Sequence, residues 1–166
     1  MTYLITFACY GAHLHGDESG SIDRLHNLPG SRVISAHAGR VALERRLMNQ
    51  PHYSLDQPRR NAVLAALLER AKKRGWTILA AHVCTNHVHV IINSDTTPER
   101  VMNDLKSYAS RHLNAIGLDT PDRKRWARHG STRWLPGRES VDAAIQYVIE
   151  KQGHAMAMYI SDSLRR

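Results

Sequence analysis

The fold is decided by one short stretch of the sequence, Asn86-His87-Val88-His89-Val90-Ile91-Ile92. Successive side chains of a β-strand point to opposite faces of the sheet. His87 and His89 therefore share one face, while Val88 and every second residue after it line the other. We expect the valine face to be buried and the histidine face to be open.

The paired histidines indicate a metal site. Two imidazoles that project in parallel from one face can occupy two positions on a divalent cation, which leaves the others for a third protein ligand, water or a phosphate oxygen. The spacing also arises by chance in a chain with 11 histidines. The motif alone therefore indicates a metal site without establishing one.

The preceding residues predict a hairpin partner for this strand. The β-rich run at residues 76–84 ends shortly before His87, a spacing that suits a tight turn. With Thr85 and Asn86 as the loop, His82 lies opposite His89 and Cys84 lies opposite His87. Three imidazoles and a thiol on one face are an alternative, four-ligand zinc site.

Further from this stretch, periodicity and capping signals predict the other elements. They are a strand at Thr2–Cys9, a helix at 61–73 ended by Gly75, a helix that opens at Pro98 with Thr97 as N-cap and ends by Gly117, a strand at 131–135 and a helix from the N-cap Ser140 to about Gln152. Residues 155–160 suit either a last strand or an unstructured end.

This order of elements predicts an α+β fold, a ferredoxin-like or RRM-like antiparallel sheet with helices on one face and the two histidines on a central strand. We expect residues 1–166 to form a single domain, with a loop-rich insertion at about 11–50.

The composition of the chain limits the kinds of partner that the protein can bind. The chain has 166 residues, with 23 Lys or Arg against 15 Asp or Glu, which gives a formal charge of +8. Because 42% of the residues are hydrophobic, the charge belongs to a folded surface, and nucleic acid is the leading anionic partner. The apolar runs are too short to span a bilayer, and the two cysteines suggest reduced thiols. We therefore expect a cytoplasmic protein without membrane contact.

Four motifs in one order resemble a known family. Thr85-Asn86-His87-Val88-His89-Val90-Ile91-Ile92 resembles the HUH segment (histidine, hydrophobic residue, histidine) of the single-tyrosine, IS200-like transposases, above all the REP-associated tyrosine transposases. Residues 105–111 are similar to the helix that follows it in those proteins. Trp126-Ala127-Arg128-His129-Gly130 is similar to their Trp-x-Arg-Gly segment, and residues 140–152 are similar to their tyrosine helix.

The resemblance implies an enzyme, a metal-dependent endonuclease and strand transferase for single-stranded DNA that acts at hairpin-forming repeats in transposition or in a domesticated process. A tyrosine hydroxyl attacks a phosphodiester and leaves a 5′-phosphotyrosine and a free 3′-hydroxyl, so that rejoining needs no nucleotide cofactor. Tyr147 matches the family tyrosine by order and context. Tyr108 is the competing candidate, although its place near an apolar stripe favours core packing.

The resemblance also implies a divalent metal, Mg²⁺ or Mn²⁺, on His87 and His89. The family's third ligand is a Gln or Asn four residues after the tyrosine, whereas this chain has Lys151 there. Gln152 lies about 100° further round an ideal helix. We assign Gln152 as the third metal ligand, which requires a local distortion, with Glu150 as its substitute.

Basic and aromatic residues that mostly follow the second helix suit single-stranded DNA, because phosphates bind cations and unstacked bases stack on aromatic rings. The predicted DNA-binding residues are Lys106, Arg111, Arg123, Lys124, Arg125, Trp126, Arg128 and Arg133. The alternative for this stretch is a solvated basic loop with its tryptophan anchored in the core.

Two other functions stay open. One is a non-catalytic DNA- or RNA-binding protein descended from such a transposase, and the other is a metallohydrolase that activates water at the histidines without a tyrosine. The sequence also leaves open whether the chain works alone or as a homodimer. In family members that act as dimers the tyrosine helix meets the histidines of the other subunit, whereas a monomer is the alternative for REP-associated relatives.

Overall fold

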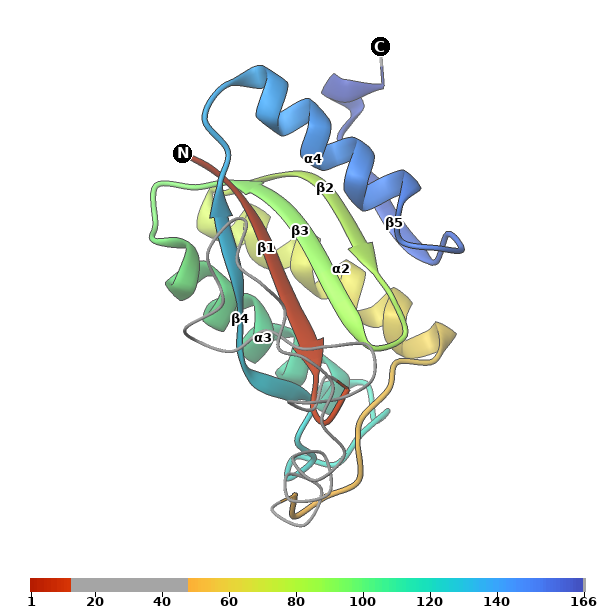
Figure 1. The fold of residues 1–166 in the computed structure, drawn as a ribbon. Helices are drawn as coiled ribbons and strands as arrows, with labels where there is room; N and C mark the ends of the chain where they lie inside the picture. The colour runs from red at the N-terminus through yellow and green to blue at the C-terminus, as the bar shows by residue number, and fades with distance from the viewer. Residues whose placement is uncertain (13–47, 166) are drawn as a thin grey trace.

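The computed structural model describes residues 1–12 and 48–165, which form a five-stranded antiparallel sheet and three α-helices (Figure 1). In chain order the elements are β1 (Thr2–Cys9), α2 (Gln57–Arg74), β2 (Thr77–Val83), β3 (His87–Asn93), α3 (Pro98–Ala115), β4 (Trp126–Trp134), α4 (Arg138–Glu150), β5 (Ala157–Ile160) and a 3₁₀ turn (Asp162–Leu164). The α+β class is confirmed. Most of the predicted insertion at 11–50 lies outside the described residues.

The strand order is β4-β1-β3-β2-β5, so the two histidines lie on the central strand, as predicted. The hairpin of β2 and β3 also has the expected register. His82 pairs with His89, and the backbone N–H of Cys84 donates to the carbonyl of His87 at 2.9 Å. A slip of one residue would exchange the two faces of β3, so this register determines where the imidazoles point.

The two faces of the sheet carry different helices. Val88, Val90 and Ile92 are fully buried in the core formed with α2 and α3. On the other face, Ala144 and Val148 of α4 pack against apolar residues of β1, β2 and β3 (Figure 1). The sequence predicts all helices on one face of the sheet. In the structure α2 and α3 share one face, and α4 lies on the opposite face.

The caps of α2 and α3 explain their bounds. Asp56 precedes α2, and its side chain accepts a hydrogen bond from the backbone N–H of Arg59 at 3.1 Å. The helix ends at Gly75, whose φ of 71° is the left-handed conformation that glycine adopts readily. Thr97 precedes α3 as predicted, but its side chain makes no capping hydrogen bond.

The bounds of α4 differ from the prediction at both ends. Its N-cap residue is Gly137, and the predicted cap Ser140 donates its hydroxyl to the carbonyl of Gly137 at 2.9 Å instead. The helix ends at Glu150, before Gln152. The early end determines the geometry of the site described below.

The last two strands complete the sheet. β4 is longer than predicted, because it begins at Trp126 within the basic stretch, and β5 is a strand that pairs with β2. No helix in the described part of the chain has both the length and the apolar composition needed to cross a membrane.

Candidate active site

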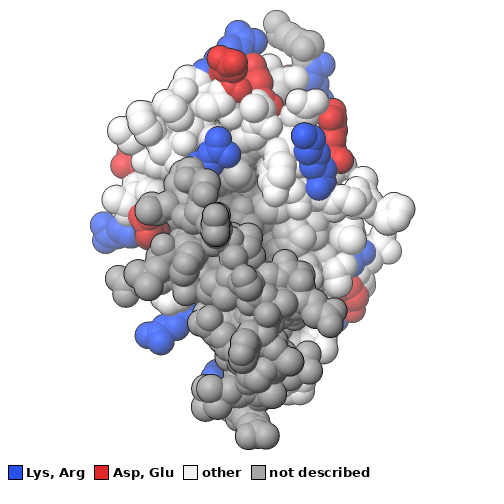
Figure 2. Space-filling model, in the orientation of Figure 1, with Lys and Arg blue, Asp and Glu red and all other residues white. Residues whose placement is uncertain are grey.

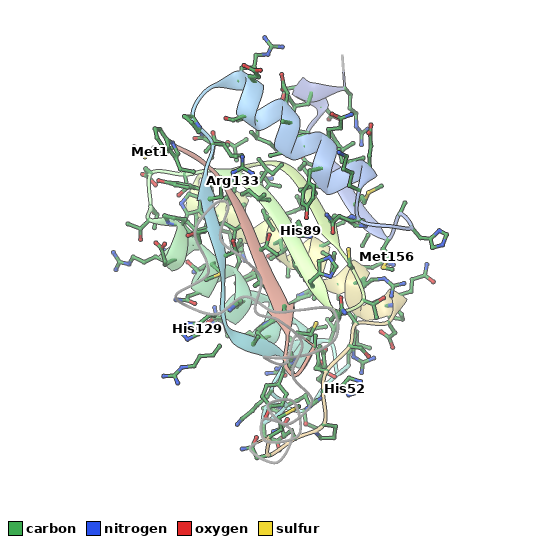
Figure 3. The ribbon with its side chains drawn as sticks, in the orientation of Figure 1. Met1, His52, His89, His129, Arg133 and Met156 are labelled. Atoms are coloured by element: carbon green, nitrogen blue, oxygen red, sulfur yellow. The ribbon has the colours of Figure 1, made fainter. Side chains whose placement is uncertain are left out.

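β3 presents His87 and His89 on the face of the sheet that carries α4. His89 is labelled in Figure 3. Their ring centroids lie 4.8 Å apart, with an angle of 76° between the ring planes. The prediction of an open histidine face is wrong, because α4 packs across it and only 5% of His89 is exposed. The histidines therefore lie beside a helix, with His89 buried and His87 partly exposed.

Each imidazole has a partner at its Nδ1 atom. His89 Nδ1 lies 2.8 Å from the hydroxyl of Thr6, its cross-strand neighbour on β1, and His87 Nδ1 lies 2.7 Å from Oδ1 of Asn86. Because an amide oxygen only accepts hydrogen bonds, the shorter contact with Asn86 favours the tautomer of His87 that carries its proton on Nδ1 and leaves the lone pair of Nε2 for a cation. Partners of this kind fix the orientation and tautomer of a metal-binding histidine.

The two Nε2 atoms meet at the side chain of Gln152. Its Oε1 lies 3.0 Å from Nε2 of His89 and 3.3 Å from Nε2 of His87. Two ligand atoms about 2.1 Å from one cation and at right angles to each other are about 3.0 Å apart. The two distances from Gln152 Oε1 thus match those between neighbouring ligand atoms of one cation. No group of three His, Cys, Asp or Glu residues within 1–12 and 48–165 is arranged to hold a metal, and the third side chain beside the two imidazoles is an amide.

The pKa of His89 is lowered to about 4, chiefly because burial disfavours the charged ring and also because His87 is close, while the hydrogen bond with Gln152 opposes the shift. His89 is therefore neutral at physiological pH. A neutral imidazole offers its ring nitrogen to a cation instead of repelling it.

Gln152 reaches the histidines because α4 stops early. The backbone N–H of Lys151 makes the last helical hydrogen bond, to the carbonyl of Tyr147 at 3.2 Å, and the chain then leaves the helical path. Glu150 is exposed, and its Oε2 accepts from Nε2 of Gln146 at 3.1 Å. Of the two predicted candidates for the third ligand, the fold brings Gln152 to the histidines and leaves Glu150 outside.

Of the two candidate nucleophiles, Tyr147 is the one beside the histidines. Its ring centroid lies 6.0 Å from that of His89, and 45% of its surface is exposed. Tyr108 lies on α3, on the other side of the sheet, where its hydroxyl accepts from Nζ of Lys73 at 2.9 Å. The geometry therefore favours Tyr147.

The alternative zinc site does not form. His82 and His89 are opposite one another as that alternative required, but both ring nitrogens of His82 face the backbone. Its Nδ1 lies 3.0 Å from the carbonyl of Val148, and its Nε2 accepts from the N–H of Met156 at 3.2 Å. Burial also raises the pKa of the Cys84 thiol to about 11, which disfavours the thiolate that zinc binds.

Two of the predicted DNA-binding cations are buried, which corrects their assignment. Nζ of Lys106 donates to the carbonyls of Ala127 and His129 in β4, at 3.0 and 3.2 Å. Arg125 is 4% exposed and donates from Nε to Asp119 at 3.1 Å. Both side chains hold parts of the fold together, and a DNA phosphate has no access to them.

Three more of the predicted residues have internal partners. Trp126 packs edge-on against Phe7 and donates its indole N–H to the carbonyl of Lys106 at 3.0 Å, as the core-anchor alternative proposed. Arg123 donates to the backbone carbonyls of residues 51 and 52, and Nζ of Lys124 donates to the side chain of Asn49 at 2.8 Å. Of these three, only Lys124 is exposed.

The other three predicted cations are exposed but do not lie together. Arg111 is on α3, behind the sheet, whereas Arg128 and Arg133 are on β4. Arg133 pairs with Leu4, which packs with α4, so it lies on the histidine face (Figure 3). Over the described part of the view in Figure 2, the Lys and Arg side chains are dispersed among acidic and uncharged residues.

Thr6 and Asp119 were not predicted from the sequence. Thr6 follows from the pairing of β1 with β3, a register that the sequence pattern alone does not fix. Asp119 accepts hydrogen bonds from Tyr53 at 2.6 Å, from Arg125 and from Arg59, and these hold its pKa below the usual range although burial raises it. In the sequence, Asp119 is distinguished only as a carboxylate just before a basic stretch.

Comparison with known proteins identifies the family. The sequence profile described as "Transposase IS200 like" matches residues 47–151. No curated protein matches the chain. Two solved structures are similar: a REP-associated tyrosine transposase bound to a REP hairpin (12% identity, 90% of this chain, 65% of that one, TM-score 0.48) and a candidate transposase from Deinococcus radiodurans R1 (18% identity, 93% of this chain, 92% of that one, TM-score 0.45). The chain thus spans about two thirds of the first structure. Since the profile covers more than half of the 166 residues, the chain belongs to the IS200-like transposase family.

Proposed function

We propose that the protein cleaves and rejoins single-stranded DNA at hairpin-forming repeats, with Tyr147 as the nucleophile and a divalent metal ion as cofactor. One observation carries the proposal. Oε1 of Gln152 lies within 3.3 Å of Nε2 of both His87 and His89, next to a half-exposed Tyr147. The hairpin character of the DNA rests on the resemblance of the sequence motifs to REP-associated tyrosine transposases.

The proposed metal ligands are these three atoms, and the proposed cation is Mg²⁺ or Mn²⁺. Because Mg²⁺ prefers oxygen ligands, the imidazole pair favours Mn²⁺ of the two. A divalent cation supplies positive charge to the non-bridging oxygens of a scissile phosphate. Thr6 and Asn86 hold the two rings with their Nε2 atoms toward Gln152. The low pKa of His89 keeps its ring neutral and available as a ligand.

Tyr147 carries the covalent step in this proposal. Its hydroxyl oxygen forms a bond to phosphorus, the bond from phosphorus to the 3′ oxygen breaks, the phenol loses its proton, and the 3′ oxygen gains one. The 5′ phosphate stays on Tyr147, so a later attack by a 3′-hydroxyl rejoins the strand without a nucleotide. The exposure of 45% of Tyr147 leaves the ring accessible to a strand of DNA. Arg133, exposed on β4 and on the same face of the sheet as the histidines, is the proposed phosphate contact.

The experiment is an adduct assay. The protein is incubated with Mn²⁺ or Mg²⁺ and a single-stranded hairpin oligonucleotide, labelled in separate reactions on the 5′ and 3′ side of the cleavage site. We expect a denaturation-resistant protein–DNA adduct that carries the 3′-side fragment and is lost in Tyr147→Phe. Tyr108→Phe, the matched control, is expected to form the adduct.

Each other outcome contradicts the proposal in a different way. Tight binding without an adduct would indicate a non-catalytic binder. Cleavage that persists in Tyr147→Phe and in Tyr108→Phe would indicate hydrolysis by an activated water. Undiminished cleavage by His87→Ala in the presence of a chelator would remove the metal from the mechanism.

A further inference from the structure

His82 is a fully buried polar residue to which the proposed chemistry gives no role. It lies on β2, directly opposite His89. Since the carbonyl of Val148 only accepts and the N–H of Met156 only donates, Nδ1 of His82 carries the proton and Nε2 carries the lone pair. Both ring nitrogens are therefore used in hydrogen bonds to the backbone of one later segment, residues 148–156.

The two hydrogen bonds of His82 bracket Gln152. Val148 comes four residues before Gln152 and Met156 comes four residues after it. The first bond, at 3.0 Å, satisfies a carbonyl in the last turn of α4, where intrahelical donors run out. The second, at 3.2 Å, fixes the backbone just before β5. One imidazole therefore holds both ends of the chain segment from which the Gln152 side chain projects.

The segment between these two points has few other attachments. Its other residues, from Lys151 to Ala155, are exposed apart from Gln152, which is partly buried. At the far end, the Thr85 hydroxyl lies 3.5 Å from Sδ of Met156, a weak contact. An exposed segment of this kind samples many conformations unless its ends are fixed. The position of Gln152 Oε1 thus depends on the two hydrogen bonds of His82.

We propose that His82 is a positioning residue that fixes residues 148–156 so that Gln152 Oε1 reaches the two histidines. The inference rests on the proposed function in that it takes Gln152, His87 and His89 as the metal ligands. His82 itself coordinates nothing. It acts through Gln152, as residues behind a metal ligand do when they fix that ligand's orientation.

Two substitutions of His82 distinguish its two hydrogen bonds. Asparagine retains a donor near the position of Nδ1, so His82→Asn is designed to keep the bond to Val148 and to lose the one to Met156. Glutamine reaches the position of Nε2, so His82→Gln is designed to keep an acceptor for Met156. Amide hydrogen exchange measured by NMR is expected to be faster at Met156 in His82→Asn than in the wild type, and restored toward the wild-type rate in His82→Gln.

Mn²⁺ binding, measured by calorimetry, tests whether His82 acts through Gln152. We expect His82→Asn to weaken Mn²⁺ binding by about tenfold. In the Gln152→Ala background, the same substitution is expected to change the affinity by less than about twofold, because the ligand it positions is already absent. Glu150→Ala, the control on the exposed carboxylate, is expected to bind Mn²⁺ like the wild type.

The possible results separate this inference from the proposed function. An equal tenfold loss in the Gln152→Ala background would overturn the role through Gln152, since it would show that His82 acts on the histidines directly. Unchanged exchange at Met156 in His82→Asn would overturn the tether, whatever the metal result. A wild-type protein that binds no Mn²⁺ while Met156 is freed in His82→Asn would remove the metal site and support the tether.

Discussion

At the scale of single residues, Lys106 is a buried cation. It is 7% exposed, and its ammonium group faces two carbonyls of β4 and the ring of Phe7, 5.6 Å away. Burial lowers its pKa to about 8 from 10.5. The folded protein therefore gives up this proton at a lower pH than the unfolded chain does.

This shift predicts how stability depends on pH. Between about pH 8 and 10.5 the unfolded chain holds more of the Lys106 proton, so the contribution of Lys106 to stability rises with pH across that window. Across the whole window, the contribution of Lys106 to the free energy of unfolding rises by about 3 kcal/mol. Urea unfolding from about pH 7 to about pH 10 is expected to show a steeper rise, or a smaller fall, for the wild type than for Lys106→Met. The exposed Lys72→Met is the control and should follow the wild type, and parallel curves for all three proteins would contradict the prediction.

Lys106 and Gln152 show why the positions of some candidate residues cannot be predicted from the sequence alone. Lys106 was assigned to DNA because it is a cation in a basic region, but its burial depends on β4, which lies far from it in sequence. Gln152 was assigned because it is close to the family position. The structure shows why its side chain reaches the histidines, since α4 ends at Glu150. His87 and His89 were predictable because alternation along one strand is a local property.

At the scale of elements, β3 is the easiest to predict and α4 the hardest. The alternation in β3 sets its buried face, and the prediction that Val88, Val90 and Ile92 lie in the core is confirmed. Only two residues of α4 are buried, Ala144 and Val148, so its apolar stripe defines neither its ends nor the face of the sheet that it covers. Those features depend on tertiary contacts.

β4 gives an element-scale prediction at Gly130. A Cβ added there would lie 2.5 Å from the carbonyl oxygen of Thr6 and 2.5 Å from Sδ of Met102, with the side chain of Phe7 at 3.2 Å. A methyl group at this point must displace β1 or α3. Gly130→Ala is expected to lower the free energy of unfolding by about 1–3 kcal/mol, measured in urea. Ser131→Ala is the control in the same strand, and an unchanged midpoint for Gly130→Ala would show that the strands separate at little cost.

For the whole molecule, the position of α4 determines how the site is assembled. The helix packs on the sheet of its own chain, through Ala144 and Val148, and the contacts of His82 hold its end there. Tyr147 consequently lies 6.0 Å, ring to ring, from a histidine of the same chain. The sequence left open whether a second subunit supplies the tyrosine. The fold contains both halves of the proposed site in one chain, because the connection from β4 to α4 brings the helix back over β2 and β3.

A mixing experiment tests this single-chain assembly. If the tyrosine and the histidines act within one chain, Tyr147→Phe and His87→Ala each lack an essential group, and neither supplies it to the other. We expect an equimolar mixture of the two variants to form no more DNA adduct than either variant alone. Adding each variant separately to the wild type controls for interference, and adduct formation is expected to continue at the wild-type level. Adduct in the mixture, carried by the His87→Ala chain, would show that its tyrosine reacts at the histidines of another subunit, and that α4 leaves its own sheet to do so.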